Sequence, residues 1–322
     1  MAPDWLTLGE EVAAALAAGR PVVALESTLV AHGLPWPANL VTARAAEAAV
    51  RAGGAVPATA VVWHGRPTLG LAPVQLEELA RTPGVFKASR RDLGAAVGLG
   101  RLAATTVSAT MALAHAAGVR VFATGGIGGA HRSAEGSAPR TADAWDISAD
   151  LTELGRTPVL VVCAGAKSIL DLPRTLEILE TLGVPVLGYR TDRFPQFYVA
   201  DSATGESLPV SARVESATEA AAAFDAHVCL GGGGAVLAQH CPADVAVPPD
   251  EFEAALGRAL ADAHRAKAHG PKATPFILAR VAELTGGRTL VANRALIVAN
   301  AALAAGAAVA LTTSRGARTC GG

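Results

Sequence analysis

A lysine, Lys167, closes a continuous apolar run at residues 158–166. Such a run is typical of an internal strand of an α/β sheet, and residues 168–183 have the spacing of a following helix. Lys167 is therefore expected at the carboxyl end of a strand, where open α/β sheets bind ligands. Partial desolvation there favours the neutral amine of a lysine, which can attack carbon. A lysine that only reaches solvent from a loop is the alternative.

A glutamate, Glu26, ends a second apolar run at residues 21–25 and is followed by two hydroxyl residues. A carboxyl group that is partly buried at a strand end can serve as a general acid or base. A carboxylate that caps the next helix or pairs with a lysine is the alternative. Lys87 and Asn293 are weaker candidates, because a solvated charge and a core hydrogen bond are the commoner roles of such residues.

A glycine-rich loop follows the apolar run at residues 119–123, with Thr124 before its glycines and His131 and Arg132 after them. Glycines let backbone N–H groups approach an anion, and the two basic residues add charge, so the loop suits a phosphate. It lacks the Gly-Lys-Ser/Thr ending of a P-loop and the later acid of a Rossmann fingerprint. Tight packing is the alternative use of these glycines.

Three acids, Asp146, Asp150 and Glu153, lie in one short segment that also contains Ser148. Magnesium and manganese prefer such oxygen-rich surroundings. The same residues fit the start of a helix, with Ser148 or Asp150 as its cap and Glu153 in its first turn. Both interpretations hold together, because a metal that keeps several waters needs only one of these acids.

Strands and helices must alternate to position these residues. Apolar strand-like runs alternate with alanine-rich helical segments; the runs are 21–25, 58–63, 119–124, 158–164 and 184–189, and the helical segments include 10–18, 105–117 and 251–264. This alternation predicts an α/β fold with a largely parallel central sheet and helices on both faces. In the helix after Lys167, leucines recur at helical spacing, Asp171 fits the cap and Gly183 ends the element.

No long linker divides the chain, so we predict a single domain over residues 1–312 and a disordered tail over 313–322. The consecutive glycines 231–234 indicate a flexible loop or a close backbone approach. The apolar stretch 295–311 is about one turn short of a membrane span and contains Asn300, so we expect a buried helix there.

The composition argues against several classes of partner. A formal net charge of −1 and an aromatic content of 4% provide neither the basic surface nor the stacking residues of a nucleic-acid-binding protein. The 4 cysteines form no CxxC pair, which favours a reducing, cytoplasmic compartment. Acids near the start stand where a signal peptide carries basic residues, so we expect no targeting segment and no membrane partner.

Together, these segments resemble the pseudouridine-5′-phosphate glycosidase family, also called the indigoidine synthase A-like family. The resemblance covers nearly the whole chain and is carried by residues 24–37, 124–132, 146–154, 164–172, 175–186, 194–198 and 292–296. The chain departs from the family pattern near Gln239, which puts contacts from residues 239–242 in question.

The resemblance implies a three-layer α/β/α fold, a homotrimer, and the reversible cleavage of pseudouridine 5′-phosphate to uracil and ribose 5-phosphate. By position, Lys167 matches the family's covalent lysine, Glu26 its proton donor and Asp146 its ligand for one Mn²⁺ ion. The positions expected to contact the substrate are Lys87, Val107, Ser148, Ala149, Asp150 and Asn293, with Thr124 and His131 from the glycine-rich loop.

A carbon–carbon glycosidic bond explains why a lysine is needed, because the base would leave as a poor carbanion in the usual two-carboxylate route. We expect Glu26 to protonate the ribose ring oxygen, and Lys167 to add at C1′ and form a Schiff base that water hydrolyses. An N-glycosidase or nucleoside hydrolase is one alternative, although it leaves Lys167 without a task. A non-catalytic sugar-phosphate sensor is the other.

Overall fold

The computed structural model describes residues 2–132, 145–199, 208–266, 268 and 273–317. A mostly parallel sheet forms its centre, and its main run is, in spatial order, β3 (Val56–Trp63), β2 (Val22–Leu25), β7 (Val121–Ala123), β9 (Leu160–Cys163), β13 (Ala235–Ala238), β11 (Val186–Tyr189) and β12 (Ala212–Val214). Every neighbouring pair in this run is parallel. The predicted parallel sheet is therefore confirmed.

The sheet continues beyond β3 with antiparallel pairing. Strands β4 (Arg66–Leu69) and β6 (Ala103–Thr105) pair antiparallel with β3, while β1 (Thr7–Leu8) and β5 (Phe86–Ala88) pair parallel with β4 and β6. A separate two-stranded sheet joins β8 (Ala130–His131) to β10 (Leu170–Asp171). This small sheet ties the glycine-rich loop to the segment after Lys167.

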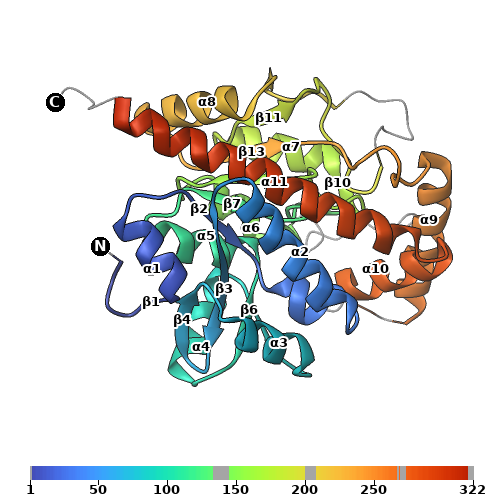
Figure 1. Ribbon diagram of the computed structural model, residues 1–322. Coiled ribbons are helices and arrows are strands. Elements are labelled where there is room, and N and C mark those ends of the chain that lie inside the picture. The colour runs from blue at the N-terminus through green and yellow to red at the C-terminus, as the bar shows by residue number, and fades with distance from the viewer. Residues whose placement is uncertain (1, 133–144, 200–207, 267, 269–272, 318–322) are drawn as a thin grey trace.

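Helices cover both faces of the main sheet and complete the three-layer α/β/α arrangement (Figure 1). One layer contains α2 (Ala38–Ala52), α8 (Ala217–Cys229) and α11 (Arg288–Ala317), and α11 contacts both of the others and β2, β7 and β9. The other layer contains α5 (Val107–Ala116), α6 (Ala149–Leu154) and α7 (Leu172–Thr181). As expected, α7 begins at a cap, because the Asp171 carboxylate accepts a hydrogen bond from the Arg174 backbone N–H.

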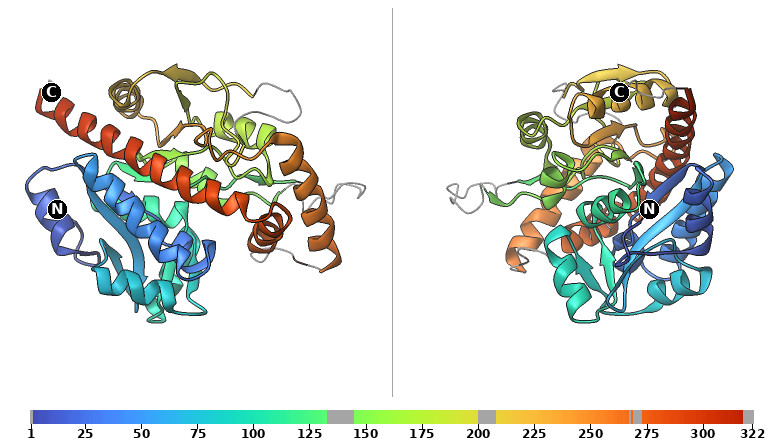
Figure 2. Two further views of the ribbon diagram at one scale, coloured as in Figure 1. Left: turned by 45° about the vertical axis from the view of Figure 1, so that its right-hand side comes forward. Right: turned by 90° about the vertical axis from the view of Figure 1, so that its left-hand side faces the viewer.

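The other helical elements of the described residues complete the fold. They are α1 (Glu10–Ala17), the π-helical η1 (Leu29–Gly33), α3 (Pro73–Arg81), the 3₁₀-helical η2 (Arg90–Asp92), α4 (Leu93–Gly98), α9 (Pro249–Arg265) and α10 (Ala273–Leu284). Figure 2 shows α9 and α10 beside each other at the end of the molecule where α11 begins.

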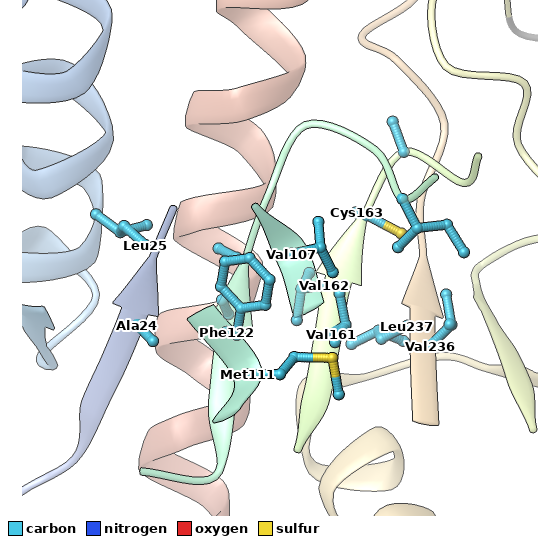
Figure 3. Packing of buried hydrophobic residues seen from close by; sticks show 14 of the residues in the cluster. Ala24, Leu25, Val107, Met111, Phe122, Val161, Val162, Cys163, Val236 and Leu237 are labelled. Atoms are coloured by element: carbon cyan, nitrogen blue, oxygen red, sulfur yellow. The ribbon is translucent and has the colours of Figure 1, made fainter. Parts of the chain in front are cut away.

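Burial from both faces explains the continuous apolar runs in the sequence. Every residue of β2, β9 and β13 is buried. Figure 3 shows Val107 and Met111 of α5 packed among Phe122, Val161 and Val162 of β7 and β9. Because such strands have no solvent-facing side, they show no alternation of polar and apolar residues.

Helix α11 corrects one prediction and confirms another. Its Arg288–Ser314 part is long and apolar enough to cross a membrane, but 56% of its most apolar window is buried inside the protein. It is thus a core helix, as we expected for residues 295–311. The expected tail from residue 313 is wrong in its start, because α11 continues to Ala317. Residues 318–322 lie outside the described part of the chain.

The glycines at 231–234 do allow a close backbone approach. A Cβ atom at Gly233 would lie 2.5 Å from the carbonyl oxygen of Gly155, and one at Gly234 would lie 2.9 Å from that of Leu154. The turn before β13 therefore packs directly against the end of α6.

Candidate active site

A cavity of about 490 Å³ opens at the carboxyl ends of the parallel strands. It brings together nine of the residues predicted from the sequence, namely Glu26, Lys87, Val107, His131, Asp146, Ser148, Ala149, Asp150 and Lys167. Glu26 follows β2, and Lys167 follows β9, the strand on the other side of β7. Parallel strands end at one edge of a sheet, so the two residues meet although they are far apart in the chain.

The Glu26 carboxylate is held by two hydroxyl groups. Thr28 donates a short hydrogen bond to one of its oxygens, and Thr124 donates a short hydrogen bond to the other. The second contact follows from strand register, because Leu25 of β2 pairs with Ala123 of β7 and the next residues along are Glu26 and Thr124. Glu26 is thus oriented by its own loop and by the neighbouring strand.

An amide relay supports this arrangement from the layer of α11. The buried Asn300 donates to the carbonyl oxygens of Thr124, at 2.8 Å, and Gly125, at 3.3 Å. Gln239 in turn donates to the Asn300 side-chain oxygen at 2.9 Å. Gln239 belongs to the segment that departs from the family pattern, so Asn300 and Thr124 link that segment to Glu26. No local pattern around Asn300 in the sequence indicated this role.

The Asp150 carboxylate is occupied by backbone groups of the protein. Its two oxygens accept hydrogen bonds from the N–H of Ser108, in the first turn of α5, and of Gly128, each at 2.9 Å. Ser148 caps α6, since its hydroxyl accepts from the Asp150 N–H at 3.2 Å. The expected helix start is confirmed, and Asp150 fastens the glycine-rich loop to α5.

The glycines of the loop meet close neighbours. A Cβ atom at Gly128 would lie 2.3 Å from the Ser148 hydroxyl oxygen, and one at Gly129 would lie 2.3 Å from that of Thr175. At Gly126 it would lie 2.8 Å from the Phe197 ring. Tight packing, the alternative stated for these glycines, therefore explains these three positions.

Two lysines face the cavity together. Lys87 in β5 is accessible to solvent through the cavity, although the surrounding walls partly desolvate its ammonium group. This desolvation lowers the pKa of Lys87, and the nearby Lys167 lowers it further, while Glu26 and Asp150 act in the opposite direction. The Lys167 backbone is fixed by bonds from its N–H to the Ile127 carbonyl, at 3.2 Å, and from the Leu170 N–H to its own carbonyl, at 2.9 Å.

Asp146 lies at the open side of the cavity. Its side chain is 57% exposed, and one of its oxygens lies 4.0 Å from Nδ1 of His131. Within the described residues, no group of three or more His, Cys, Asp or Glu side chains gathers in a way that could hold a metal ion. The donor set at Asp146 therefore fits only an ion that keeps most of its ligands as water or substrate oxygens.

Several residues of the cavity were missed from the sequence. They are Thr28, Ser89, Arg91, Thr106, Trp145, Ile147 and Leu170. Arg91 is the most informative of them, because its side chain is 83% exposed and it carries a charge at the same cavity as Lys87. Arg91 lies close to Lys87 in the sequence, and this proximity could have indicated that it belongs to the same site.

Two predicted substrate contacts do not line this cavity. Thr124 acts behind Glu26 instead, through its hydroxyl group. Asn293 lies half-buried on α11, and its side-chain oxygen would be 3.4 Å from a Cβ atom placed at Gly125. Both residues therefore support the wall that carries Glu26.

The chain is similar to known proteins over nearly its whole length. The model of the family described as "Indigoidine synthase A like protein" matches residues 11–310. A pseudouridine-5′-phosphate glycosidase of Herpetosiphon aurantiacus is 54% identical over 96% of this chain and 99% of that protein. One of Methylobacterium nodulans is 53% identical over 98% of this chain and 90% of that protein.

Solved structures agree with this relationship. The prealnumycin C-glycosynthase AlnA, in complex with ribulose 5-phosphate, superposes with a TM-score of 0.87 at 39% identity, covering 98% of this chain and 100% of that one. An indigoidine synthase A-like protein of Thermotoga maritima gives a TM-score of 0.83 at 33% identity, covering 95% and 96%. This chain therefore belongs to the indigoidine synthase A-like family.

Proposed function

We propose that this protein catalyses the reversible cleavage of the carbon–carbon glycosidic bond of pseudouridine 5′-phosphate, giving uracil and ribose 5-phosphate. The observation that carries the proposal is the meeting of Glu26 and Lys167 in one cavity at the ends of β2 and β9. The names of the relatives support the substrate, and the ribulose 5-phosphate complex of the C-glycosynthase supports a sugar phosphate in such a site.

The chemistry begins with ring opening. Glu26 donates a proton to the ribose ring oxygen, the C1′–O bond breaks, and electrons from the uracil compensate at C1′. The neutral amine of Lys167 then adds to C1′, and protonation of uracil C5 breaks the carbon–carbon bond. Water hydrolyses the resulting Schiff base, releases ribose 5-phosphate and restores the amine. The net reaction consumes one water and leaves the protein unchanged.

The cations of the cavity suit the phosphate group. We assign the phosphate to the side that carries Lys87 and Arg91, next to Val107 at the start of α5. Backbone N–H groups at a helix start add to the attraction of the two cations. The rest of the substrate then faces three other residues that line the cavity, namely Ser148, Ala149 and His131.

We further propose a divalent manganese ion at Asp146, whose exposed carboxylate faces the same cavity. Such an ion, when bound, would polarise oxygens of the sugar or phosphate. Asp146 itself would supply one oxygen ligand. We also propose a homotrimer, an expectation that comes from the family resemblance and is checked by light scattering in solution. A cytoplasmic location is proposed from the scattered cysteines.

The decisive experiment traps the covalent intermediate. Wild type, Lys167→Ala and Lys87→Ala are incubated with ribose 5-phosphate and borohydride, and intact mass is measured together with uracil release from pseudouridine 5′-phosphate. We expect an adduct in wild type and Lys87→Ala and none in Lys167→Ala, whose turnover falls by at least about 10³-fold. Unchanged turnover in Lys167→Ala would contradict the mechanism and favour a hydrolase; binding without turnover in wild type would favour a sensor.

A further inference from the structure

A second, much smaller cavity lies behind Glu26. Its volume is about 20 Å³, which is room for one water molecule. Most of its lining is apolar, from residues such as Ala46 and Ile297, and its polar side chains are those of Glu26, Thr59 and Thr124. Glu26 therefore borders both cavities, with the substrate cavity on one side and this small pocket, lined in part by residues of α2 and α11, on the other.

Two hydroxyl groups that line this pocket each donate a hydrogen bond to a carboxyl group. On one side, the Thr124 hydroxyl donates to Glu26. On the other side, the Thr59 hydroxyl donates to Glu47 of α2 at 2.8 Å. Strand register produces this geometry, because Thr59 of β3 pairs with Leu25 of β2, the residue before Glu26.

Glu47 lies between the core and solvent. Its side chain is 14% exposed, and one of its oxygens lies 3.6 Å from the Arg51 guanidinium, which also binds Glu11 at 2.8 Å. The side chains of Arg51 and Glu11 are about half exposed, at 47% and 50%. Burial raises the pKa of Glu47, although the hydrogen bond from Thr59 and the charge of Arg51 act against the rise. Glu47 is thus a carboxyl group suited to holding and exchanging a proton at the surface.

We propose that Glu47 and Thr59, together with one water in the small cavity and Thr124, form a proton relay that reloads Glu26 after each turnover. The proposal rests on the proposed function, in which Glu26 gives a proton to the substrate. Glu47 passes its proton to the Thr59 oxygen while the Thr59 hydroxyl proton moves to the water. The water passes a proton to the Thr124 oxygen, and the Thr124 hydroxyl proton moves to Glu26. One proton crosses, no bond other than O–H changes, and Glu47 regains a proton from solvent. The proton that is set free when water hydrolyses the Schiff base leaves to solvent and balances this uptake.

The relay allows a proton to reach Glu26 while the substrate is bound. A bound nucleotide occupies the large cavity and separates Glu26 from bulk water on that side. The route behind Glu26 is independent of the substrate, because none of Thr59, Thr124 and Glu47 lines the large cavity. Proton return through the small cavity then continues while the Schiff base is still present.

The test separates the first turnover from later ones. Thr59→Val removes the hydroxyl at nearly constant volume, Thr59→Ser keeps it, and Thr42→Val removes another buried hydroxyl, one that donates within α2 to the Ala38 carbonyl at 2.8 Å. Uracil release is measured with enzyme in excess and with substrate in excess. We expect Thr59→Val to keep the first-turnover rate within about twofold and to lose about tenfold in steady-state kcat. Thr59→Ser and Thr42→Val should match wild type.

Two results would overturn the relay. If the steady-state kcat of Thr59→Val equals that of Thr42→Val, then Glu26 is reloaded by another route. If the first turnover and the steady state fall equally, the hydroxyl serves the chemical step or the fold. Either result leaves the proposed function standing, whereas absence of uracil release by wild type removes the proposed function and the relay with it.

Discussion

The two sides of the large cavity differ in how their carboxylates are held. On the inner side, formed by Glu26, Asp150, Lys87 and Lys167, both oxygens of each carboxylate accept hydrogen bonds from the protein. On the outer side, formed by Trp145, Asp146 and His131, the carboxylate is 57% exposed and its histidine neighbour is 4.0 Å away. The carboxylates of Glu26 and Asp150 are positioned by the fold before any ligand binds, while Asp146 remains available to a ligand.

Asp146 and Asp150 make the contrast sharpest, because they come from one short segment. Asp150 is buried and satisfies the N–H groups of two separate elements. A buried charge with two good donors is structural, since removing it leaves both donors without a partner. An exposed acid at a cavity mouth costs the fold little, and its role depends on what enters the cavity.

The largest effect on stability is expected from Asp150→Ala. It leaves the N–H groups of Ser108 and Gly128 without their charged acceptor, so the free energy of unfolding should fall by about 3 kcal/mol or more. Ser148→Ala, which removes only the cap of α6, should cost about 1 kcal/mol. Urea unfolding compares the two. Equal urea midpoints for Asp150→Ala and wild type would show that the inner side is not fastened by Asp150.

A smaller loss is expected from Gly128→Ala. The added methyl group would lie 2.3 Å from the Ser148 oxygen and 2.8 Å from an Asp150 oxygen, so overpacking should cost about 1–3 kcal/mol. Gly94→Ala is the control, because it lies in α4 with no neighbour within 4 Å of its Cβ position, and it should be neutral or stabilising. Thermal unfolding of both variants measures the difference; a loss at Gly94 as large as at Gly128 would argue against packing as the cause.

On the outer side, Asp146→Asn should change stability by less than about 0.5 kcal/mol, because the side chain is mostly exposed. Manganese affinity, measured by calorimetry, should instead weaken by about tenfold or more, since the variant lacks the charged ligand. Asp192→Asn, at another exposed acid with a 76% exposed side chain, serves as the control. Unaltered manganese binding by Asp146→Asn would place the metal elsewhere.

The smallest effect is expected from Lys87→Met, and it depends on pH. Since the pKa of Lys87 is lowered in the folded protein, the unfolded chain holds this proton more tightly. Between the lowered pKa and the ordinary value near 10.5, the wild-type stability therefore gains with rising pH, and the gain is lost as pH falls. The difference in unfolding free energy between wild type and Lys87→Met should shift in favour of wild type as pH rises through this window. Parallel stability curves would contradict the desolvation of Lys87.

Much of the fold and of the candidate site could be predicted from the sequence. Apolar runs without alternation identified β2, β7 and β9 as buried parallel strands, and such strands bring Glu26 and Lys167 to one edge of the sheet. The predicted end of α11 was too early. The residues after 312 are polar or small, which is typical of a tail, but the helix continues through them to Ala317. The acceptors and donors around each site residue were also missed, since they come from other elements.

Local sequence was therefore enough to predict which residues stand at strand ends, because a parallel strand that is buried on both faces is a continuous apolar run, and the run stops at the first polar residue. The contacts of those residues depend on how the chain folds in three dimensions. Thr124 reaches Glu26 across 98 positions of the chain, Asn300 reaches Thr124 across 176, and Asp150 reaches Ser108 across 42. These contacts depend on strand register and helix packing. They join segments that are far apart in the chain, so the local sequence around one partner does not indicate the other.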